Sequence, residues 1–270
     1  MAFQLAHPGA RLPTLRAKNA TLDYDVSGAG PTIIQLHGLT SSRARDASLG
    51  LDLSARASEH RVIRYDARGH GASAGDHDPR SYTWSHLALD LLAVIDAESP
   101  TQTVHGVGQS MGSATLVHAA LAEPSRFASL VLGIPPTAWD SRVPQRRVYR
   151  ANADLIEHAG LGPLLEADKG ASRPPAARAT DVSPPTVIED LLPAVFRGAA
   201  LADLPPPQEL TGITMPTLLL AWVGDPAHPL STAQRLHDLL PHSSLVVAHT
   251  PAQVEKWPDL VAQHVSLNSH

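Results

Sequence analysis

The chain contains no cysteine among its 270 residues. Disulfide frameworks, thiolate metal sites and cysteine nucleophiles are therefore excluded. No apolar run approaches the roughly 18 residues that a membrane-spanning helix needs, so no membrane association is expected. The first residues also lack the basic segment and apolar stretch of a secretory signal. Together these absences predict a cytoplasmic protein.

Neither sign of charge dominates. The chain has 21 Lys and Arg against 26 Asp and Glu, a net charge of −5 without strong clustering. A nucleic-acid-binding protein would carry a basic stripe, so no nucleic-acid partner is expected. The histidines and carboxylates match no recognised metal-ligand spacing, and Gly69 and Gly71 lack the third glycine of a dinucleotide fingerprint. We expect no metal and no other cofactor.

What the chain does contain is a regular alternation of strand and helix patterns, beginning with a hairpin over residues 12–26. The predicted strands that follow are 32–36, 61–66, 102–107, 129–134, 217–223 and 244–248, and the predicted helices are 47–57, 82–97, 111–122, 231–240 and 252–266. Such alternation favours right-handed crossovers and a mostly parallel sheet covered on both faces. The fold class predicted is α/β, doubly wound, with an eight-stranded sheet.

Residues 137–212 interrupt this alternation. They are rich in proline and arginine, with helical pieces predicted at 142–158 and 185–199. Proline cannot donate to a sheet ladder, so this segment supplies no central strand. We expect residues 1–136 and 213–270 to form the core, and residues 137–212 to form a helical lid. The lid would lie over the carboxyl ends of the strands, where open α/β sheets bind ligands.

The sequence Gly108-Gln109-Ser110-Met111-Gly112 joins a predicted strand to a predicted helix. A serine between two glycines at such a junction is typical of a nucleophile elbow, a turn too tight for larger flanking residues. A serine hydroxyl is a weak nucleophile until a histidine base and an orienting acid activate it. The alternative role for Ser110 is simply to cap the helix.

Five stretches carry a resemblance to a known family: residues 36–42, 65–73, 106–112, 224–229, and the last predicted strand with the loop after it. On these residues the chain resembles the α/β-hydrolase family over nearly its whole length. Within that family it is most similar to the small esterase, enol-lactonase and cofactor-free haloperoxidase group. The resemblance implies a catalytic triad of serine, histidine and acid.

The resemblance places the acid at Asp225, directly after the seventh strand; Asp140 and Asp203 are weaker alternatives. It places the base in the loop after the last strand, where His249 is the only histidine. That loop lacks the family's glycine and is about two residues short. His228, close to Asp225 in the sequence, is the alternative base.

The resemblance also implies an oxyanion hole made by the backbone amides of Leu39 and Met111. Such fixed N–H donors stabilise the negative oxygen of a tetrahedral acyl intermediate. His37 is expected to orient the loop beside Leu39 and is a candidate for substrate binding. Asp66 and Arg68 are expected to form a structural ion pair beneath the site.

Arginines gather at the start of the predicted lid. Trp139, Arg142 and Arg146 are candidates for substrate binding, because guanidinium groups hold carboxylates through paired hydrogen bonds. The alternative is that these arginines cover a solvated helix face with positive charge.

The sequence therefore predicts a serine hydrolase whose partner is a small carboxylic ester or lactone. Ser110 is the expected nucleophile, His249 the base and Asp225 the acid. The same machinery could instead serve carbon–carbon bond hydrolysis, acyl transfer or perhydrolysis, because the fold does not fix the reaction. A hydrolase-like protein that binds a ligand without turnover is the more distant alternative. The oligomeric state is left open.

Overall fold

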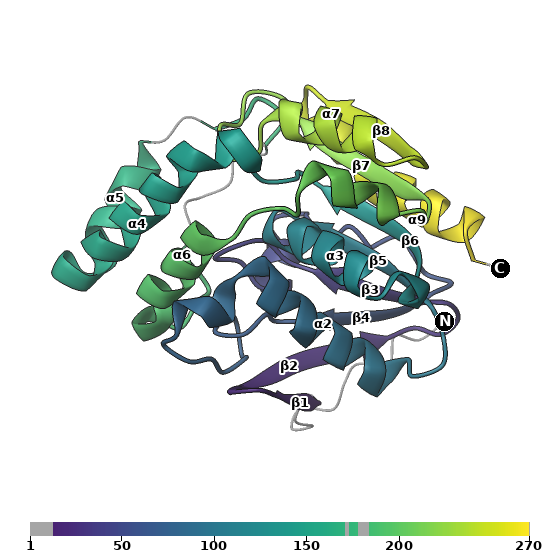
Figure 1. Cartoon of the computed structure of the whole chain (residues 1–270), viewed down its shortest axis with the longest axis horizontal. Coiled ribbons are helices and arrows are strands. Elements are labelled where there is room, and N and C mark those ends of the chain that lie inside the picture. Colours follow the sequence, from purple (N-terminus) through teal and green to yellow (C-terminus); the bar gives the residue numbers. More distant parts are fainter. Residues whose placement is uncertain (1–12, 171–172, 178–183, 270) are drawn as a thin grey trace.

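The computed structural model of the chain describes residues 13–170, 173–177 and 184–269. Its strands form one eight-stranded sheet in the order β1-β2-β4-β3-β5-β6-β7-β8 (Figure 1). The strands are β1 Thr14–Ala17, β2 Ala20–Ser27, β3 Thr32–Leu36, β4 Arg61–Tyr65, β5 Val104–Gln109, β6 Phe127–Gly133, β7 Thr217–Trp222 and β8 Ser243–Ala248. The predicted fold class is confirmed. The first residues, used above to argue against a secretory signal, lie outside the described part.

The sheet is parallel except at one end. β1 pairs with β2, and β2 with β4, in antiparallel fashion, whereas the other neighbouring strands are parallel. β3 lies between β4 and β5, so the chain builds outward from β3 in both directions. At this switch point Leu36, the last residue of β3, is opposite Gly108 of β5. The loops after β3 and β5 therefore leave the sheet side by side, the usual position of a ligand site in such folds.

Helices cover both faces of the sheet, as a parallel sheet requires. They are α1 Arg43–Ser48, α2 Trp84–Glu98, α3 Met111–Ala122, α4 Arg142–Ala159, α5 Gly162–Lys169, α6 Leu192–Leu201, α7 Leu230–Leu239, α8 Pro251–Val254 and α9 Trp257–Leu267. Short 3₁₀ turns lie at Pro79–Tyr82, Pro124–Arg126, Trp139–Ser141, Glu189–Leu191 and Pro207–Gly212. Within the described ranges, every helix is too short or too polar to cross a membrane.

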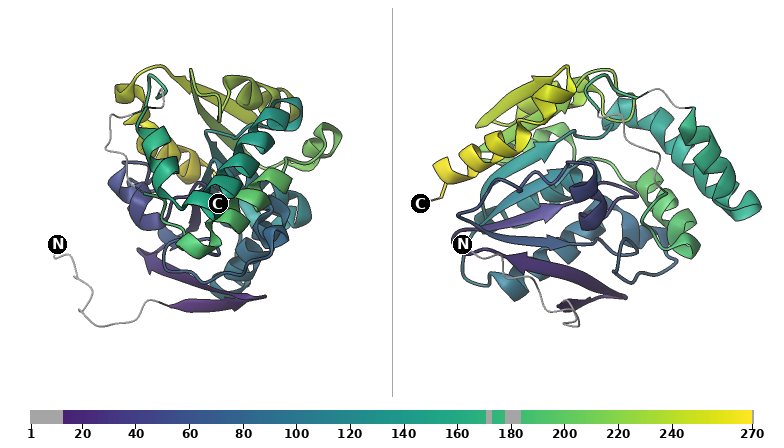
Figure 2. Two further views of the ribbon diagram at one scale, coloured as in Figure 1. Left: turned by 90° about the vertical axis from the view of Figure 1, so that its left-hand side faces the viewer. Right: turned by 180° about the vertical axis from the view of Figure 1, so that it is seen from behind.

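The core has two halves, one on each face of the sheet. Apolar residues of α2, α3 and α7 fill one half, and residues of α9 with the segment 49–57 fill the other. Figures 1 and 2 show α2 and α3 on one side of the strands and α9 on the opposite side. All residues of β3, β5 and β7 are buried, because both of their faces are covered.

Three predicted helices differ from those observed. Of the helix predicted at 47–57, only residues 47 and 48 are helical: α1 begins at Arg43, after the Ser42 N-cap, and ends before Gly50, a left-handed residue with φ 68°. The helix predicted at 252–266 is split into α8 and α9. The piece predicted at 185–199 starts with a 3₁₀ turn at Glu189 and becomes α-helical only at Leu192, because Val187 instead pairs with His70 as an isolated β-bridge. Local pattern did not reveal this tertiary pairing.

The insertion, as we call the segment between β6 and β7, contacts the loops at the carboxyl ends of the strands. Thr186 donates its backbone N–H to Thr40, two residues into the loop that follows His37-Gly38, at 3.0 Å. Gly71, in the loop after β4, donates to Thr186 at 2.6 Å. The helices α4 and α5 extend away from the sheet, and α6 lies closer to it (Figure 2). The division into a core and a lid at residues 137 and 212 stays a prediction.

Arg142 holds the insertion to the core. Its side chain is fully buried, with the guanidinium 4.2 Å from the ring centroid of Trp84 in α2. The guanidinium donates to the carbonyls of Ala199 and Ala202 at 2.6 and 3.2 Å, and to Thr137 Oγ1 at 3.1 Å. The two carbonyls belong to the end of α6, where helices lack internal donors and attract cations. The role is therefore a cap and a bridge, not the substrate binding predicted for Arg142.

Replacing Arg142 by methionine should destabilise the protein while keeping the apolar stem. The loss of the guanidinium leaves buried acceptors unpaired and removes the contact with Trp84, so we expect the free energy of unfolding to fall by about 2 to 4 kcal/mol. Arg147, exposed on the same helix, is the matched control. Arg147→Met should change the free energy of unfolding by less than about 0.5 kcal/mol. Urea unfolding measures both; equal effects would contradict the assignment.

Candidate active site

Ser110 occupies a strained turn between β5 and α3. Its backbone has φ 51° and ψ −117°, in a region that non-glycine residues rarely adopt. A side chain at Gly108 would meet the backbone of Gly112 at 2.6 Å, and one at Gly112 would meet the carbonyl of Leu36 at 2.6 Å. The turn closes only because both flanking residues are glycine. This is the geometry predicted for a nucleophile elbow.

Two backbone amides are candidates for the oxyanion hole: Met111, next to Ser110, and Leu39, next to Gly38, where an added Cβ would lie 3.4 Å from Ser110 Cβ. Met111 is the first residue of α3, so its N–H has no partner within the helix. For the N–H of Leu39, no acceptor is found in the described ranges. The loop that carries Leu39 is held in place at Thr40, which has φ 61° and whose carbonyl accepts from Arg45 Nη1 at 2.9 Å and from Thr186 N at 3.0 Å. The insertion thus helps to fix the loop beside the serine.

His228 is the histidine that contacts Ser110. Its Nε2 lies 2.7 Å from Ser110 Oγ, and its Nδ1 lies 2.8 Å from Asp225 Oδ2. With Nδ1 protonated, the ring donates to the carboxylate and accepts from the serine hydroxyl, which is the tautomer that both distances favour. A hydroxyl, an imidazole and a carboxylate therefore form one hydrogen-bonded chain, the arrangement that can activate a serine for nucleophilic attack.

The carboxylate of Asp225 is fully engaged. Oδ1 accepts from the backbone amides of Ala227 and His228 at 2.9 and 3.3 Å, and Oδ2 also accepts from the indole Nε1 of Trp222 at 2.9 Å. Burial raises the pKa of Asp225, but the hydrogen bonds and the charge of His228 outweigh burial, and the net pKa is lowered. Asp225 is thus kept ionised and aimed at the imidazole.

The expected base, His249, does not reach the serine. β8 ends at Ala248 and α8 begins at Pro251, so only two residues join them. Gln253 Oε1 accepts from the backbone amides of His249 and Thr250, at 2.6 and 3.2 Å, which ties this linker to α8. His249 is exposed. The prediction from the sequence that the imidazole of His249 lies beside Ser110 was therefore wrong. The short loop and its missing glycine were the features of the sequence that argued against His249.

His37 is a structural residue of the loop after β3. The ring is buried, with Nδ1 2.8 Å from the carbonyl of Gly38 and Nε2 accepting from the amide of Ala67 at 2.9 Å. Burial lowers the pKa of His37 to about 4, so the ring stays neutral. Both nitrogens are occupied, which agrees with the expected orienting role and leaves neither for the substrate binding also predicted.

Asp66 and Arg68 do not pair with each other as predicted. Asp66 accepts from the amides of Arg43 and Ala72, each at 3.0 Å. Arg68 is fully buried and makes two hydrogen bonds of 2.7 Å to Asp90 in α2. The glycine-rich turn directs the two side chains to different neighbours. Both remain structural, but in separate networks.

Trp139 and Arg146 join the two ends of the insertion. Trp139 donates its backbone N–H to Asp203 Oδ1 and its indole Nε1 to the carbonyl of Pro205, each at 2.9 Å. Arg146 pairs with Asp203 Oδ2 at 2.7 Å. This geometry gives the predicted substrate binding no support. It also occupies the carboxylate of Asp203, one of the alternative acids, while Asp140, the other alternative, is exposed.

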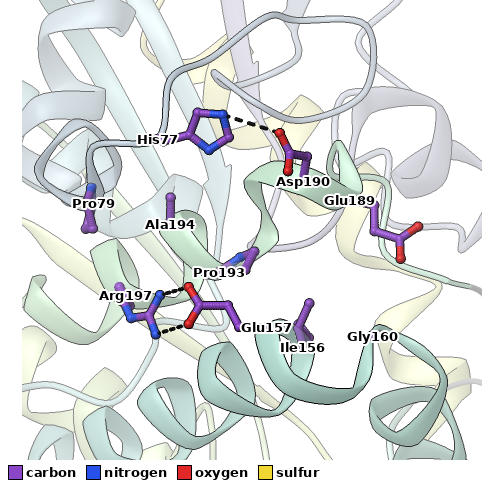
Figure 3. A pocket seen from close by; sticks show the side chains of 10 residues that line it. All are labelled: His77, Pro79, Ile156, Glu157, Gly160, Glu189, Asp190, Pro193, Ala194 and Arg197. Atoms are coloured by element: carbon purple, nitrogen blue, oxygen red, sulfur yellow. Dashed lines mark hydrogen bonds and ion pairs between the residues drawn. The ribbon is translucent and has the colours of Figure 1, made fainter.

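A cavity of about 680 Å³ lies apart from Ser110 (Figure 3). It is lined by residues of α4, α6 and the turn at Pro79. Two pairs of its lining side chains contact each other: Arg197 with Glu157 at 2.7 Å, and His77 with Asp190 at 3.3 Å. Ser110, Asp225 and His228 do not line it. Over the described residues, no group of three or more histidines and carboxylates is arranged to hold a metal ion.

Residues 29–251 match the family model described as serine aminopeptidase, S33. The chain is a member of the α/β-hydrolase family. This α/β hydrolase is 32% identical over 253 residues to a Variovorax paradoxus (strain S110) protein named as a carbamate hydrolase, RutD; the match covers 86% of this chain and 92% of the relative. It is also similar to 3-oxoadipate enol-lactonase 2 of Acinetobacter baylyi (strain ATCC 33305 / BD413 / ADP1), 30% identical over 69% of each chain.

A solved structure supports the same assignment. A hydrolase from Pseudomonas aeruginosa PA01 superposes on this α/β hydrolase with a TM-score of 0.77 at 25% identity, covering 95% of this chain and 97% of that one. The predicted family, and the prediction that the protein is a hydrolytic enzyme, are confirmed.

Replacing Trp222 by phenylalanine should lower kcat. The change removes the indole donor to Asp225 and keeps the ring, so a buried carboxylate oxygen loses one partner; we expect a loss of about tenfold, equivalent to about 1.4 kcal/mol. The control is Trp257→Phe, because Trp257 packs on Trp222 with 6.0 Å between ring centroids and its indole Nε1 has no acceptor in the described ranges. Ester hydrolysis kinetics measure both variants. An equal loss in the two would indicate a packing effect instead.

Proposed function

We propose that this protein is a serine hydrolase that cleaves a small carboxylic ester or lactone through an acyl-enzyme. The observation that carries the proposal is the 2.7 Å contact between Ser110 Oγ and His228 Nε2, with Asp225 behind the imidazole. Ser110 is the nucleophile, His228 the base and Asp225 the orienting acid. The amides of Leu39 and Met111 form the oxyanion hole.

The reaction proceeds in two steps. Ser110 Oγ attacks the substrate carbonyl and passes its proton to His228 Nε2, while the amides of Leu39 and Met111 stabilise the negative oxygen of the tetrahedral intermediate. The imidazolium then protonates the leaving alkoxide as its bond to the acyl carbon breaks, and the acyl group remains as an ester of Ser110. Water, deprotonated by the same histidine, releases the acid and restores the hydroxyl. All proton transfers use one nitrogen, since Nδ1 stays bonded to Asp225.

The substrate class is supported by the relatives. They include proteins named as an enol-lactonase and as a carbamate hydrolase, names that describe cleavage of a lactone and of a carbamate.

Covalent labelling tests the chemistry directly. A fluorophosphonate should add its mass to Ser110 in the folded protein, and Ser110→Ala should abolish both labelling and turnover. Failure to label would favour the ligand-binding alternative without turnover. A panel of p-nitrophenyl esters, lactones, carbamates and vinylogous diketones, with peroxide and alcohol as alternative acceptors, separates ester and lactone hydrolysis from carbon–carbon hydrolysis, perhydrolysis and acyl transfer.

The two candidate bases are separated by a pair of variants. We expect His228→Ala to lower kcat by at least about 10³-fold, because the serine proton then has no acceptor. His249→Ala should stay within about twofold of wild type, since an exposed residue outside the hydrogen-bonded chain contributes little. The rate of p-nitrophenyl acetate hydrolysis measures both. A large loss in His249→Ala with little loss in His228→Ala would instead identify His249, in the loop after β8, as the base.

A further inference from the structure

Asp46 is a buried carboxyl group behind the candidate active site. It lies in α1, is 1% exposed, and accepts a hydrogen bond of 2.6 Å from Ser41 Oγ. Ser41 closes the turn that carries Leu39, since its backbone N–H donates to Gly38 at 3.1 Å. On the other side lies Gln109, the residue before Ser110, whose side-chain amide is close enough to the carboxyl to lower its pKa. Asp46 thus joins the two segments that form the oxyanion hole.

The surroundings of Asp46 do not favour an ion. Burial raises its pKa to about 7, even though the hydroxyl of Ser41, the amide of Gln109 and the charge of Arg45 lower it. The charge of Asp52 raises it further. Of the charged groups acting on the carboxyl, Arg45 is the cation and Asp52 the anion. A buried carboxylate held mainly by neutral donors loses much of its hydration, and the hydrogen bonds from those donors do not offset that loss.

Two buried acceptors at this place lack a donor. Asp46 Oδ2 and Gln109 Oε1 have no hydrogen-bond partner within the described ranges. A proton on Oδ2 gives the carboxyl a donor, and the amide of Gln109 can turn its oxygen toward that donor. The bond from Ser41 to Oδ1 is unaffected. The neutral acid therefore satisfies more of this buried polar cluster than the ion does.

We infer that Asp46 acts as a neutral carboxylic acid, a positioning residue that ties the turn of Gly38–Ser41 to Gln109 beneath the oxyanion hole. This inference rests on the proposed function for its effect on the reaction. An ionised Asp46 would put a negative charge behind the place where the substrate oxygen becomes negative, which opposes the transition state. Deprotonation should therefore lower kcat without removing any group that touches the substrate.

Asp46→Asn separates charge from structure. Asparagine keeps the acceptor for Ser41, presents an N–H donor to Gln109, and does not ionise. We expect kcat for p-nitrophenyl acetate within about threefold of wild type near pH 6, whereas Asp46→Ala loses tenfold or more. Above about pH 7, kcat of the wild type should decline as Asp46 ionises, and that decline should be absent in Asp46→Asn.

Asp52→Asn is the matched control, since it removes the neighbouring carboxylate and leaves Ser41 and Gln109 in place. It should retain the decline and move it to lower pH, because Asp52 raises the pKa of Asp46. An Asp46→Asn variant as impaired as Asp46→Ala, or one that keeps the decline, overturns the inference.

A second measurement needs no turnover. In Ser110→Ala protein with ¹³C-labelled aspartate, the carboxyl resonance missing from the Asp46→Asn spectrum should titrate near pH 7; one that stays ionised down to about pH 5 overturns the inference. Thermal unfolding adds the linked effect. A raised pKa stabilises the fold below the unfolded value of about 4 and loses that contribution as pH rises through about 7. Asp46→Asn should therefore gain in Tm over wild type across this range.

If Ser110 is not labelled and no ester is cleaved, the proposed function fails, yet the titration and the Tm difference still decide whether Asp46 is neutral. If the ester is cleaved and Asp46 proves ionised at pH 6, the inference about Asp46 fails and the proposed triad stands. The Asn variant and the Ser110→Ala titration also remain decisive if Asp46→Ala does not fold.

Discussion

The hydrogen bond between Ser110 and His228 depends on the parallel register of four neighbouring strands. β3, β5, β6 and β7 all end at the same edge, so their loops meet there although they are far apart in the sequence. The Ser110 amide donates to Gly133 at the end of β6, and Asp225 follows β7 by three residues. The rigid sheet thus sets the distance from hydroxyl to imidazole, which a loop alone could not hold so closely.

Placing the proposed base and acid on one loop changes what orients the imidazole. His228 follows Asp225 by three residues, and the carboxylate binds both the ring of His228 and its backbone amide. The loop therefore folds around its own acid, and Trp222 anchors that acid to the end of β7. The loop after β8 is released from this role and is short enough to enter α8 directly. One four-residue turn, residues 225–228, therefore carries both the proposed acid and the proposed base, which would otherwise come from two separate loops.

The insertion and the core are connected through polar contacts in the interior. Arg142 binds the end of α6 and the ring of Trp84, and Thr186 binds the turn beside Leu39. Buried polar groups of this kind are costly when unpaired, so each pairing specifies one arrangement of the insertion over the sheet edge. Candidate substrate ligands such as Arg142 and Trp139 are used in this way. Their residue types suggested substrate binding, whereas their contacts show that they hold the insertion in place.

The sequence by itself determined the fold and the turn that carries the proposed nucleophile, because those depend on local patterns. Alternating apolar runs predicted the parallel sheet, and the glycines around Ser110 predicted a turn that only glycine permits. The proposed acid after β7 followed from the family resemblance. The histidine beside Ser110 was decided only by the tertiary structure, since two residues between β8 and α8 keep His249 away and the turn at Asp225 brings His228 close. A contact between distant segments depends on loop length and packing, which residue types alone do not specify.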